Sequence, residues 1–424
     1  MIDVTRTLGP AGGIARVFGL QPPTPRDPLW TAGVELRSPG PDDNSLPLSA
    51  RMVGACGLAR NDALVRGAGE AVERFALHPG RAAGPVRGRR TGLPAPAVEF
   101  HRPEVALGAP HAADLELHWY PARRLRDGAK VMVPAPLVDW PCDPRESAYF
   151  DPGPSGAASG LGWEMALHAA LLEVVERDAV MVAWQRGLRA YRVADPAALA
   201  APGGDGERSR RALGELWQRA RREGMTPFLV VLPTAHPAVW CCVGGLDDAD
   251  GDLAAIGCKA SDRPWEAALG AFQEAWQVRS VLLRARESGV RPVAAEEIVD
   301  EDDRIAYLAS PAGAAAVREW LAGCDGDAAQ VAWTPGVGTE ELVAAVLADG
   351  GDPLVVDLAA RLPEPLRAMG WHALKVVPVG YQQLRMDERH TWSWNRARLA
   401  SAVERTGLAA RRTADDDAPP HPLP

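Results

Sequence analysis

Hydrophobic residues recur at helical spacing in three segments of this chain that also carry paired polar side chains. In each segment, two side chains that contain oxygen lie at positions i and i+3, which are neighbours on one face of a helix. The surrounding apolar residues predict that each pair lies on a helix with little other polar surface. These predicted helices cover about residues 60–78, 163–183 and 264–286, and their polar pairs lie in Gly69–Arg74, Leu172–Arg177 and Gln273–Arg279.

The second segment is the most informative. On a helix, Glu173, Glu176 and Arg177 fall within about 100° of one another, and leucine and valine residues fill the remaining arc. Carboxylates in such an apolar background are costly to bury without a partner. One Glu-x-x-Glu-Arg is usually a solvated helix face with local ion pairs, but three acidic pairs that converge would suit hard cations bridging a polyphosphate. The sequence therefore predicts a nucleotide site without a P-loop.

Strands and loops are predicted between these helices. Residues 1–45 are rich in Gly and Pro, which predicts an irregular arm with one strand at Thr31–Arg37. Small residues in Pro154–Gly160 would let the backbone approach an anion at the start of the second helix. Gly257–Pro264 is interpreted as a loop that starts the third helix. Further strands are predicted at Glu116–Tyr120, Val131–Val138, 227–233, 238–245, Leu354–Leu358 and Ala373–Pro378, and a surface helix at 207–223.

Composition narrows the class of function. The 424 residues are 47% hydrophobic, which supports a sizeable core, and the net charge of −9 argues against a nucleic-acid-binding surface. No apolar run approaches the length of a membrane span, and Met1–Arg6 lacks the apolar region of a signal peptide, so we expect a cytoplasmic protein. None of the six cysteines forms a Cys-x-x-Cys pair, which argues against a zinc site.

Several blocks, taken together, resemble the YcaO family. They are Gly69–Arg74, Ser155–Gly160 followed by Ala169–Ala179, and Gly257–Arg279. The final Pro420-His421-Pro422-Leu423-Pro424 looks like the Pro-x-Pro-x-Pro terminus of the azoline-forming members. The resemblance implies an α+β, YcaO-type fold with mixed sheets, in which the acidic helices converge on a nucleotide cavity. It also implies three parts, an irregular arm at 1–45, a YcaO domain at 46–395, and a helix end with a Pro-rich tail at 396–424.

The resemblance implies ATP-dependent cyclodehydration of Cys, Ser or Thr in a ribosomally made precursor peptide. The side chain attacks the preceding carbonyl, the backbone amide oxygen is phosphorylated, and loss of phosphate leaves a thiazoline or oxazoline. The expected cofactors are ATP and Mg²⁺. By the resemblance, the metal ligands are Glu70, Glu73, Glu173, Glu176 and Glu274, the nucleotide contacts are Arg74, Ser155, Arg177, Gln277 and Arg279, and the terminal carboxylate of Pro424 is catalytic.

Four positions depart from the family pattern. Where family members have Lys, Ser, Asn and Arg, this chain has Cys56, Arg66, Leu161 and Gly270. Lys259 is interpreted either as a replacement cation or as a surface lysine. Two alternatives stay open beside azoline formation. One is a thioamide- or amidine-forming YcaO enzyme, against which the Pro-rich ending argues, and the other is a degenerate, non-catalytic scaffold or peptide-binding protein.

The same resemblance gives the expected partners. The precursor peptide is the substrate, and the segment before the core is too short for a fused recognition domain. We therefore expect a separate leader-peptide-binding partner protein of the E1-like or ThiF-like kind. An FMN-dependent azoline dehydrogenase and a homodimer are compatible with the resemblance, whereas no nucleic acid and no membrane is expected as a partner.

Overall fold

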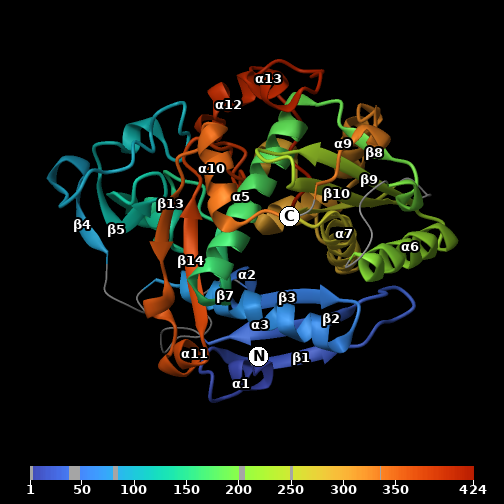
Figure 1. Ribbon diagram of the computed structural model, residues 1–424, viewed down its shortest axis with the longest axis horizontal. Helices are drawn as coiled ribbons and strands as arrows, with labels where there is room; N and C mark the ends of the chain where they lie inside the picture. The colour runs from blue at the N-terminus through green and yellow to red at the C-terminus, as the bar shows by residue number, and fades with distance from the viewer. Residues whose placement is uncertain (1–2, 38–47, 80–84, 200–205, 249–251, 335) are drawn as a thin grey trace. The chain divides into compact units, whose positions relative to one another are not determined.

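The structure is a computed structural model that describes residues 3–37, 48–79, 85–199, 206–248, 252–334 and 336–424 (Figure 1). The chain forms two compact units. The first comprises Met1–Pro23, Leu29–Val174 and Leu342–Leu384, and the second comprises Thr24–Pro28, Val175–Glu341 and Arg385–Pro424. Helix α5, Gly162–Arg186, begins in the first unit and ends in the second, so that it contributes residues to both.

A three-stranded antiparallel sheet in the first unit packs against helix α3 (Figure 1). The strands are β1, Ala15–Gln21, β2, Trp30–Leu36, and β3, Met52–Gly57, and α3 spans Arg60–Leu77. The strand predicted near Thr31–Arg37 is confirmed as β2. The prediction of an otherwise irregular arm over residues 1–45 is wrong, although 38–45 lie outside the described residues. Only Ala15 of β1 is buried, so its pairing with β2 rather than a buried face decides its structure.

The first unit also contains a six-stranded sheet in the order β4-β5-β13-β14-β7, with β6 paired to β5. Strand β7 occupies the second half of the loop that was predicted at Pro154–Gly160, because its backbone pairs with β14. Helix α3 contacts both β7 and β14, which places its acidic residues beside this edge of the sheet. The strands span Val86–Arg89 (β4), Glu116–Arg124 (β5), Lys130–Pro134 (β6), Ala157–Leu161 (β7), Leu354–Asp357 (β13) and Trp371–Val377 (β14).

The second unit contains a five-stranded sheet in the order β11-β10-β9-β8-β12. The strands predicted at 227–233 and 238–245 are confirmed as β9 and β10, which pair in antiparallel orientation, and β8 pairs with β12 in parallel. Helix α7, Pro264–Glu287, packs on β10 and β11, and α6, Glu207–Arg222, packs on β9 and α7. The strands span Tyr191–Val193 (β8), Thr226–Pro233 (β9), Trp240–Asp247 (β10), Ala254–Ser261 (β11) and Gly326–Asp327 (β12).

The loop predicted at Gly257–Pro264 is wrong, because most of it belongs to β11. Its glycine and polar residues are typical of a loop, but Gly257 lies opposite Gly244 in the β10–β11 ladder. A Cβ on Gly257 would lie 2.4 Å from the backbone nitrogen of Ala275 in α7. The glycine therefore allows the helix to approach the sheet closely, which is a packing requirement rather than a turn signal.

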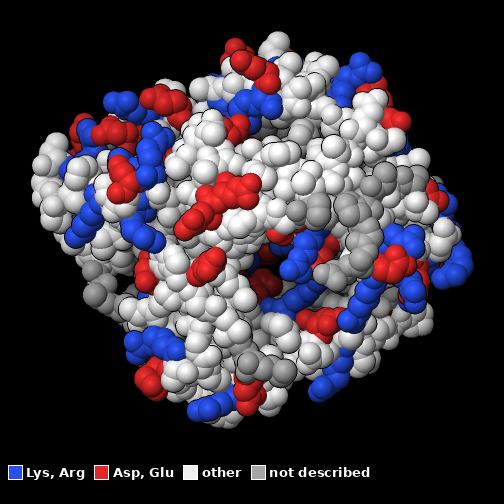
Figure 2. Space-filling view, in the orientation of Figure 1, with Lys and Arg blue, Asp and Glu red and all other residues white. Residues whose placement is uncertain are grey.

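The predicted helices at 60–78, 163–183, 207–223 and 264–286 are confirmed as α3, α5, α6 and α7, and the predicted α+β class with mixed sheets is also confirmed. Among the described residues, none of the helices combines the length and apolar composition needed to cross a membrane. On the face of the molecule shown in Figure 2, Lys and Arg are interspersed with Asp and Glu. The other α-helices are α1, Val4–Leu8, α2, Leu48–Arg51, α4, Pro144–Ser147, α8, Glu301–Leu308, α9, Pro311–Ala322, α10, Thr339–Ala348, α11, Glu364–Ala368, α12, Arg396–Ala400, and α13, Ala402–Thr406.

Candidate functional site

In the first unit, two helices place carboxylates close enough to repel one another. Glu70 and Glu73 lie one turn apart on α3, and Glu173 lies on α5. Burial raises the pKa of Glu73 well above its usual value, and the negative charge of Glu173 raises it further. The positive charge of Arg74 partly offsets both effects. Because like charges in a poorly solvated place favour neutralisation, this arrangement would be stabilised by a bound cation.

Arg74 bridges the two acidic residues of its own helix. Its Nη2 lies 3.5 Å from Glu70 Oε1, and its Nε lies 3.6 Å from Glu73 Oε1. Its guanidinium group also lies over the ring of Trp140, 5.1 Å from the centroid. The planar group is thereby held on one side by the aromatic face. This position of Arg74 is compatible with a role in orienting the two carboxylates.

Lys375 belongs to the same cluster, and the sequence analysis did not select it. It lies on β14, and its Nζ donates hydrogen bonds to the carbonyl oxygens of Gly153, at 2.7 Å, and Ser155, at 2.6 Å. Burial lowers the pKa of Lys375 to about 8, although the charges of Glu173 and Glu73 act in the opposite direction. A signal was available, since the chain has only three lysines and this one lies in an apolar strand.

The small-residue loop before β7 is fastened to β14. Val376 N–H donates to the carbonyl oxygen of Gly156 at 2.7 Å. Gly156 has a φ of +82°, and a Cβ there would lie 2.4 Å from the carbonyl oxygen of Val376. Only glycine fits at this position. Together with Lys375, this contact fixes the backbone around Ser155 beside the carboxylates of the first unit.

In the second unit, two carboxylates share the backbone of β11. Ala260 N–H donates to Glu176 Oε2 at 2.6 Å, and Cys258 N–H donates to Glu274 Oε2 at 2.8 Å. Arg177 Nη1 lies 3.4 Å from Glu176 Oε1 and 3.2 Å from Cys258 Sγ. An ionised carboxylate offers about four acceptor positions, so both residues retain capacity for a further ligand.

Glu274 is the carboxylate of this group whose proton affinity is most clearly altered. Burial raises its pKa to about 7, the charge of Glu176 contributes in the same direction, and Arg177 opposes them. Burial also raises the pKa of Cys258 well above its usual value, so its sulfur stays a thiol that donates toward Glu176 Oε1 at 3.4 Å. The second unit therefore resembles the first. In both, a bound cation would offset the repulsion between neighbouring glutamate side chains.

One position that departs from the family pattern, Gly270, lies beside Lys259, the candidate replacement cation. Gly270 lies on α7, and a Cβ there would lie 2.9 Å from Cγ of Lys259, which extends from β11. The charge of Lys259 lowers the pKa of Glu274. The side chain of Lys259 therefore runs over the helix position where family members carry Arg. Of the other departures, Cys56 is buried on β3, and Leu161 is exposed at the end of β7.

The remaining predicted residues are distributed as follows. Arg279 Nη2 lies 4.0 Å from Asp248 Oδ2, and Gln277 lies on α7 one turn after Glu274. The convergence of three acidic helices stays a prediction, because α3 belongs to the first unit and α7 to the second. The first unit holds Glu70, Glu73, Arg74, Ser155 and Glu173, and the second holds Glu176, Arg177, Glu274, Gln277, Arg279 and Pro424.

These donors suit magnesium bound together with phosphate. Across the described ranges, no group of three or more His, Cys, Asp or Glu side chains is arranged to hold a metal ion unaided. Mg²⁺ usually binds through one or two carboxylates and completes its coordination with water and substrate phosphates. Burial raises the pKa values of Glu73 and Glu274 more than the neighbouring Arg and Lys side chains lower them, so a further cation would stabilise both carboxylates. Both features fit a metal–nucleotide complex better than an all-protein metal site.

The Pro-rich tail is packed into the second unit. Pro420, His421, Pro422 and Leu423 are buried. Trp184 Nε1–H, near the end of α5, donates to the carbonyl oxygen of Pro419 at 2.7 Å. Because successive prolines restrict the backbone to extended conformations, the tail loses little entropy when it docks.

Comparison with known proteins identifies the family. The sequence model of a family described as "YcaO cyclodehydratase, ATP-ad Mg2+-binding" matches residues 54–380. The prediction of ATP and Mg²⁺ as cofactors is confirmed by this description. Comparison with curated protein sequences found no match.

Solved structures share the fold. YcaO from Methanopyrus kandleri, bound with AMPPCP and Mg²⁺, is 21% identical with a TM-score of 0.61, covering 88% of this chain and 86% of that chain. A heterocyclase in complex with substrate and cofactor is 17% identical with a TM-score of 0.67, covering 90% of this chain and 52% of that chain. The E. coli microcin synthetase McbBCD complex with pro-MccB17 bound is 11% identical with a TM-score of 0.57, covering 85% and 86%.

Proposed function

The chain belongs to the YcaO family, and on that premise we propose that it catalyses ATP-dependent cyclodehydration of Cys, Ser or Thr in a ribosomally made peptide. The observation that carries the proposal is the pair of glutamates in each unit whose mutual charge and burial raise a pKa, at Glu73 and at Glu274. Such carboxylates favour a divalent cation and its phosphate ligands. The Pro-rich tail supports azoline formation over thioamide or amidine formation, because that ending goes with azoline-forming members.

The proposed reaction balances without a redox partner. A thiol or hydroxyl of the peptide adds to the preceding carbonyl carbon, and its proton passes to a base. The former carbonyl oxygen takes the γ-phosphoryl group, and ADP leaves. The amide nitrogen then loses its proton to a base, its electron pair forms a C=N bond in the five-membered ring, and inorganic phosphate leaves with the former carbonyl oxygen. When bound, MgATP supplies the phosphoryl group that makes the oxygen a leaving group.

The residues of this chain have distinct proposed roles. Glu70, Glu73, Glu173, Glu176 and Glu274 would hold the metal ions, and Arg74 and Arg177 would orient these carboxylates or contact phosphate. Ser155, Gln277 and Arg279 would bind the nucleotide, and Lys375 would fix the loop that presents Ser155. Placing positive charge where the transferred phosphoryl group develops negative charge would be the largest catalytic contribution. The carboxylate of Pro424 would orient the reacting amide or accept the proton.

We propose a separate protein partner that binds the leader part of the precursor. A chain of the E. coli microcin synthetase McbBCD complex with pro-MccB17 bound shares this chain's fold, which supports a partner that acts together with this chain. Holding the precursor beside the enzyme would raise its effective concentration, a gain of about a hundredfold or more. An FMN-dependent azoline dehydrogenase would act after this enzyme, because oxidation of an azoline to an azole requires an electron acceptor.

The function is tested by incubating the chain with a candidate precursor, a leader-binding partner and MgATP. We expect peptide-dependent phosphate release and the loss of one water mass from the peptide for each phosphate released. Omitting the partner should slow both. If no Cys- or Ser-containing precursor encoded by a neighbouring gene gives phosphate release or mass loss, the result would favour the non-catalytic scaffold. In a parallel reaction supplied with sulfide, phosphate release with a sulfur-for-oxygen mass change would favour thioamide formation.

Lys259 is proposed to replace the arginine that family members carry at the position of Gly270. Lys259→Ala should weaken the binding of MgATP about tenfold, because one charge-assisted contact contributes roughly 1.5 kcal/mol. The double variant Lys259→Ala, Gly270→Arg should recover the affinity, since alanine removes the Cγ that would lie 2.9 Å from the new Cβ and keeps only Cβ, at 3.2 Å. Isothermal titration measures both dissociation constants. Lys130→Ala, which removes an exposed lysine on β6, is the matched control and should leave affinity unchanged. Full affinity in Lys259→Ala would show that Lys259 is only a surface residue.

A further inference from the structure

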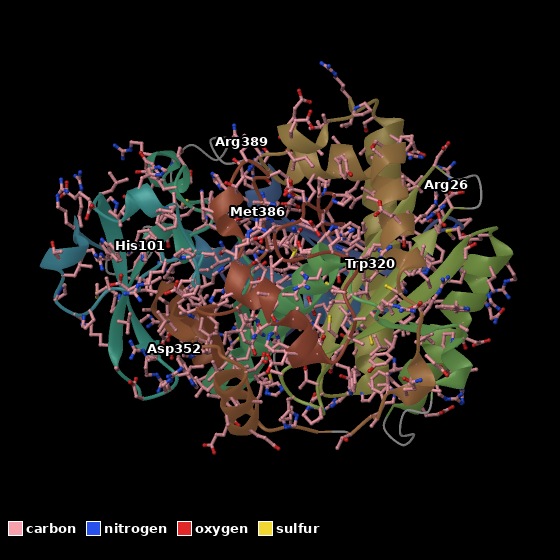
Figure 3. All side chains as sticks on the ribbon, turned by 90° about the horizontal axis from the view of Figure 1, so that it is seen from above. Arg26, His101, Trp320, Asp352, Met386 and Arg389 are labelled. Atoms are coloured by element: carbon pink, nitrogen blue, oxygen red, sulfur yellow. The ribbon has the colours of Figure 1, made fainter. Side chains whose placement is uncertain are left out.

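The C-terminal tail is attached to the second unit at two places. At the first, Gln185 Nε2–H donates to the carbonyl oxygen of Asp416 at 2.6 Å, beside the bond from Trp184 to Pro419. The ring of Trp184 packs against that of Trp320, with centroids 5.6 Å apart, and Trp320 is labelled in Figure 3. These contacts hold the tail to the C-terminal end of α5. They leave the last few residues to be positioned by a second attachment.

His421 makes the second attachment. Its side chain is 2% exposed, and Nε2 lies 2.5 Å from the carbonyl oxygen of Arg385. Arg304 Nη1 donates to the carbonyl oxygen of His421 at 3.3 Å. A carbonyl oxygen can only accept, so Nε2 must carry the ring hydrogen. Nδ1 therefore holds the lone pair, and within the described structure it has no hydrogen-bond partner.

Arg304 connects the tail to the segment that follows β14. The side chain of Arg304 is completely buried, and its Nη2 donates to the carbonyl oxygen of Met386 at 3.0 Å and lies 2.8 Å from Glu388 Oε1. Met386 and Arg389 mark this segment in Figure 3. The segment thus contacts the tail twice, through the Arg385 carbonyl and through Arg304. Displacing His421 would break both contacts at once.

The charges around the imidazole are positive. Arg304 from α8, Arg385 from the following segment and Arg177 from α5 all act on His421. The carboxylate that lies nearest to two of them is Glu388, which pairs with Arg304 at 2.8 Å and with Arg385 at 2.9 Å. Burial first, and then the charge of Arg304, lower the pKa of His421 well below its usual value. The same field makes this imidazole a weak base, which argues against a role in proton transfer.

We propose that His421 is the positioning residue of the tail: a neutral imidazole, held between the Arg385 carbonyl and three arginines, docks the Pro-rich end in one place and releases it when protonated. This role goes beyond the tail's sequence pattern, because any residue is compatible with the second position of Pro-x-Pro-x-Pro. The inference rests on the proposed function only where it gives the docked tail a part in the reaction. Docking itself needs neither nucleotide nor peptide.

The direction of the pH effect follows from linkage. An undocked histidine has a pKa of about 6.5, whereas docking requires the neutral form. Docking is therefore strongest above that pH and weakens as the pH falls through it. At pH 5.5 the docking equilibrium should be about tenfold weaker than at pH 7.5. Glutamine at this position can donate a hydrogen bond from its amide but cannot be protonated, so His421→Gln should remove this dependence.

The test is cleavage by an aspartate-specific endoproteinase at Asp415–Asp417, monitored by intact mass. A protease must bind several extended residues on both sides of the cut, so a docked tail slows cleavage. We expect equal rates for wild type and His421→Gln at pH 7.5. At pH 5.5, wild type should be cleaved about tenfold faster than His421→Gln. Their ratio cancels the pH dependence of the protease and of other titrating groups.

Two further variants complete the design. His421→Ala and His421→Lys should both be cleaved about tenfold or more faster than wild type at pH 7.5, since the first removes the donor and the second adds charge beside three arginines. His111→Gln, which alters an exposed histidine, is the matched control and should keep the wild-type pH response. Nitrogen-15 shifts of the histidines should show His421 with hydrogen on Nε2 and no titration above pH 5.5.

Each result decides the proposal. Wild-type cleavage rates in His421→Ala at pH 7.5 would show that His421 does not dock the tail. Equal rates for wild type and His421→Gln at pH 5.5 would show that protonation does not release it. These readouts stand even if no precursor peptide is cyclised, so failure of the proposed function is seen separately as an absence of phosphate release. If that function holds, the acid limb of the rate profile should also shift to lower pH in His421→Gln.

Discussion

Glu176→Gln is expected to lower peptide-dependent ATP consumption by about 10²–10³-fold, because it removes one negative charge from the proposed metal–phosphate site. The substitution keeps an oxygen that can accept the hydrogen bond from Ala260 N–H. The fold should therefore be retained. Phosphate release with peptide and partner measures the activity, and thermal unfolding measures the stability.

Alanine at this position is a less clean test than the sequence suggests. Glu176→Ala should abolish activity too, but it would leave the buried Ala260 N–H without its acceptor. An orphaned buried donor costs about 1–3 kcal/mol of the free energy of unfolding. The glutamine variant separates the charge from the hydrogen bond. Its comparison with alanine therefore distinguishes catalysis from stability.

Glu164→Gln provides the matched control on the same helix. Glu164 is exposed in the first turn of α5, so its substitution should change turnover less than twofold. Wild-type turnover by Glu176→Gln would exclude a metal role for this residue. Loss of activity accompanied by unfolding in Glu176→Gln would instead show a structural role.

Removing residues 419–424 is expected to reduce azoline formation about a hundredfold, since misplacing a group at the reacting centre commonly costs that much. MgATP binding should stay within about threefold of wild type, because the proposed nucleotide ligands lie outside the tail. The truncation also removes Leu423, which is 1% exposed. Exposing the surface that it covers should lower the free energy of unfolding by about 1.5–3 kcal/mol.

The control for the truncation keeps the docked residues and changes only the acidic segment before them. Replacing Asp415 and Asp417 with Asn leaves the docked residues and their contacts in place, and these two aspartates are exposed. That variant should cyclise the peptide at the wild-type rate. Chromatography that separates cyclised from linear peptide measures the rate of cyclisation by both variants. A truncated protein that is less stable but fully active would show that the tail serves only to stabilise the fold.

The acidic helices were predictable because the residues that indicate each helix lie within that helix. Apolar residues at helical spacing in α3, α5 and α7 indicate the helical period and the face on which each glutamate lies. The predicted ends agree with the observed ones to within three residues, as for α5, Gly162–Arg186. The pairs at i and i+3 needed only the geometry of one helix, so Glu173 and Glu176 were identifiable from sequence.

Strands β1 and β11 were not predictable in the same way. Their glycines and polar residues resemble loops when they are viewed alone, and their hydrogen bonds come from partner strands. Gly257 in particular is explained by the close approach of α7 rather than by a turn. Lys375 and His421 were missed as members of polar clusters for a related reason. Their partners, Ser155 and Arg385, are distant or unremarkable in sequence.

The sequence by itself determined which helices form, which glutamates pair along them, and the family to which the chain belongs, because these depend on local periodicity and on motifs. Only the tertiary structure decided what surrounds each charge. The raised pKa of Glu274, the contact of Lys259 with the empty position at Gly270, and the burial of His421 among arginines all arise between residues far apart in the chain. Desolvation and Coulomb interactions depend on distance in space, which sequence spacing does not encode.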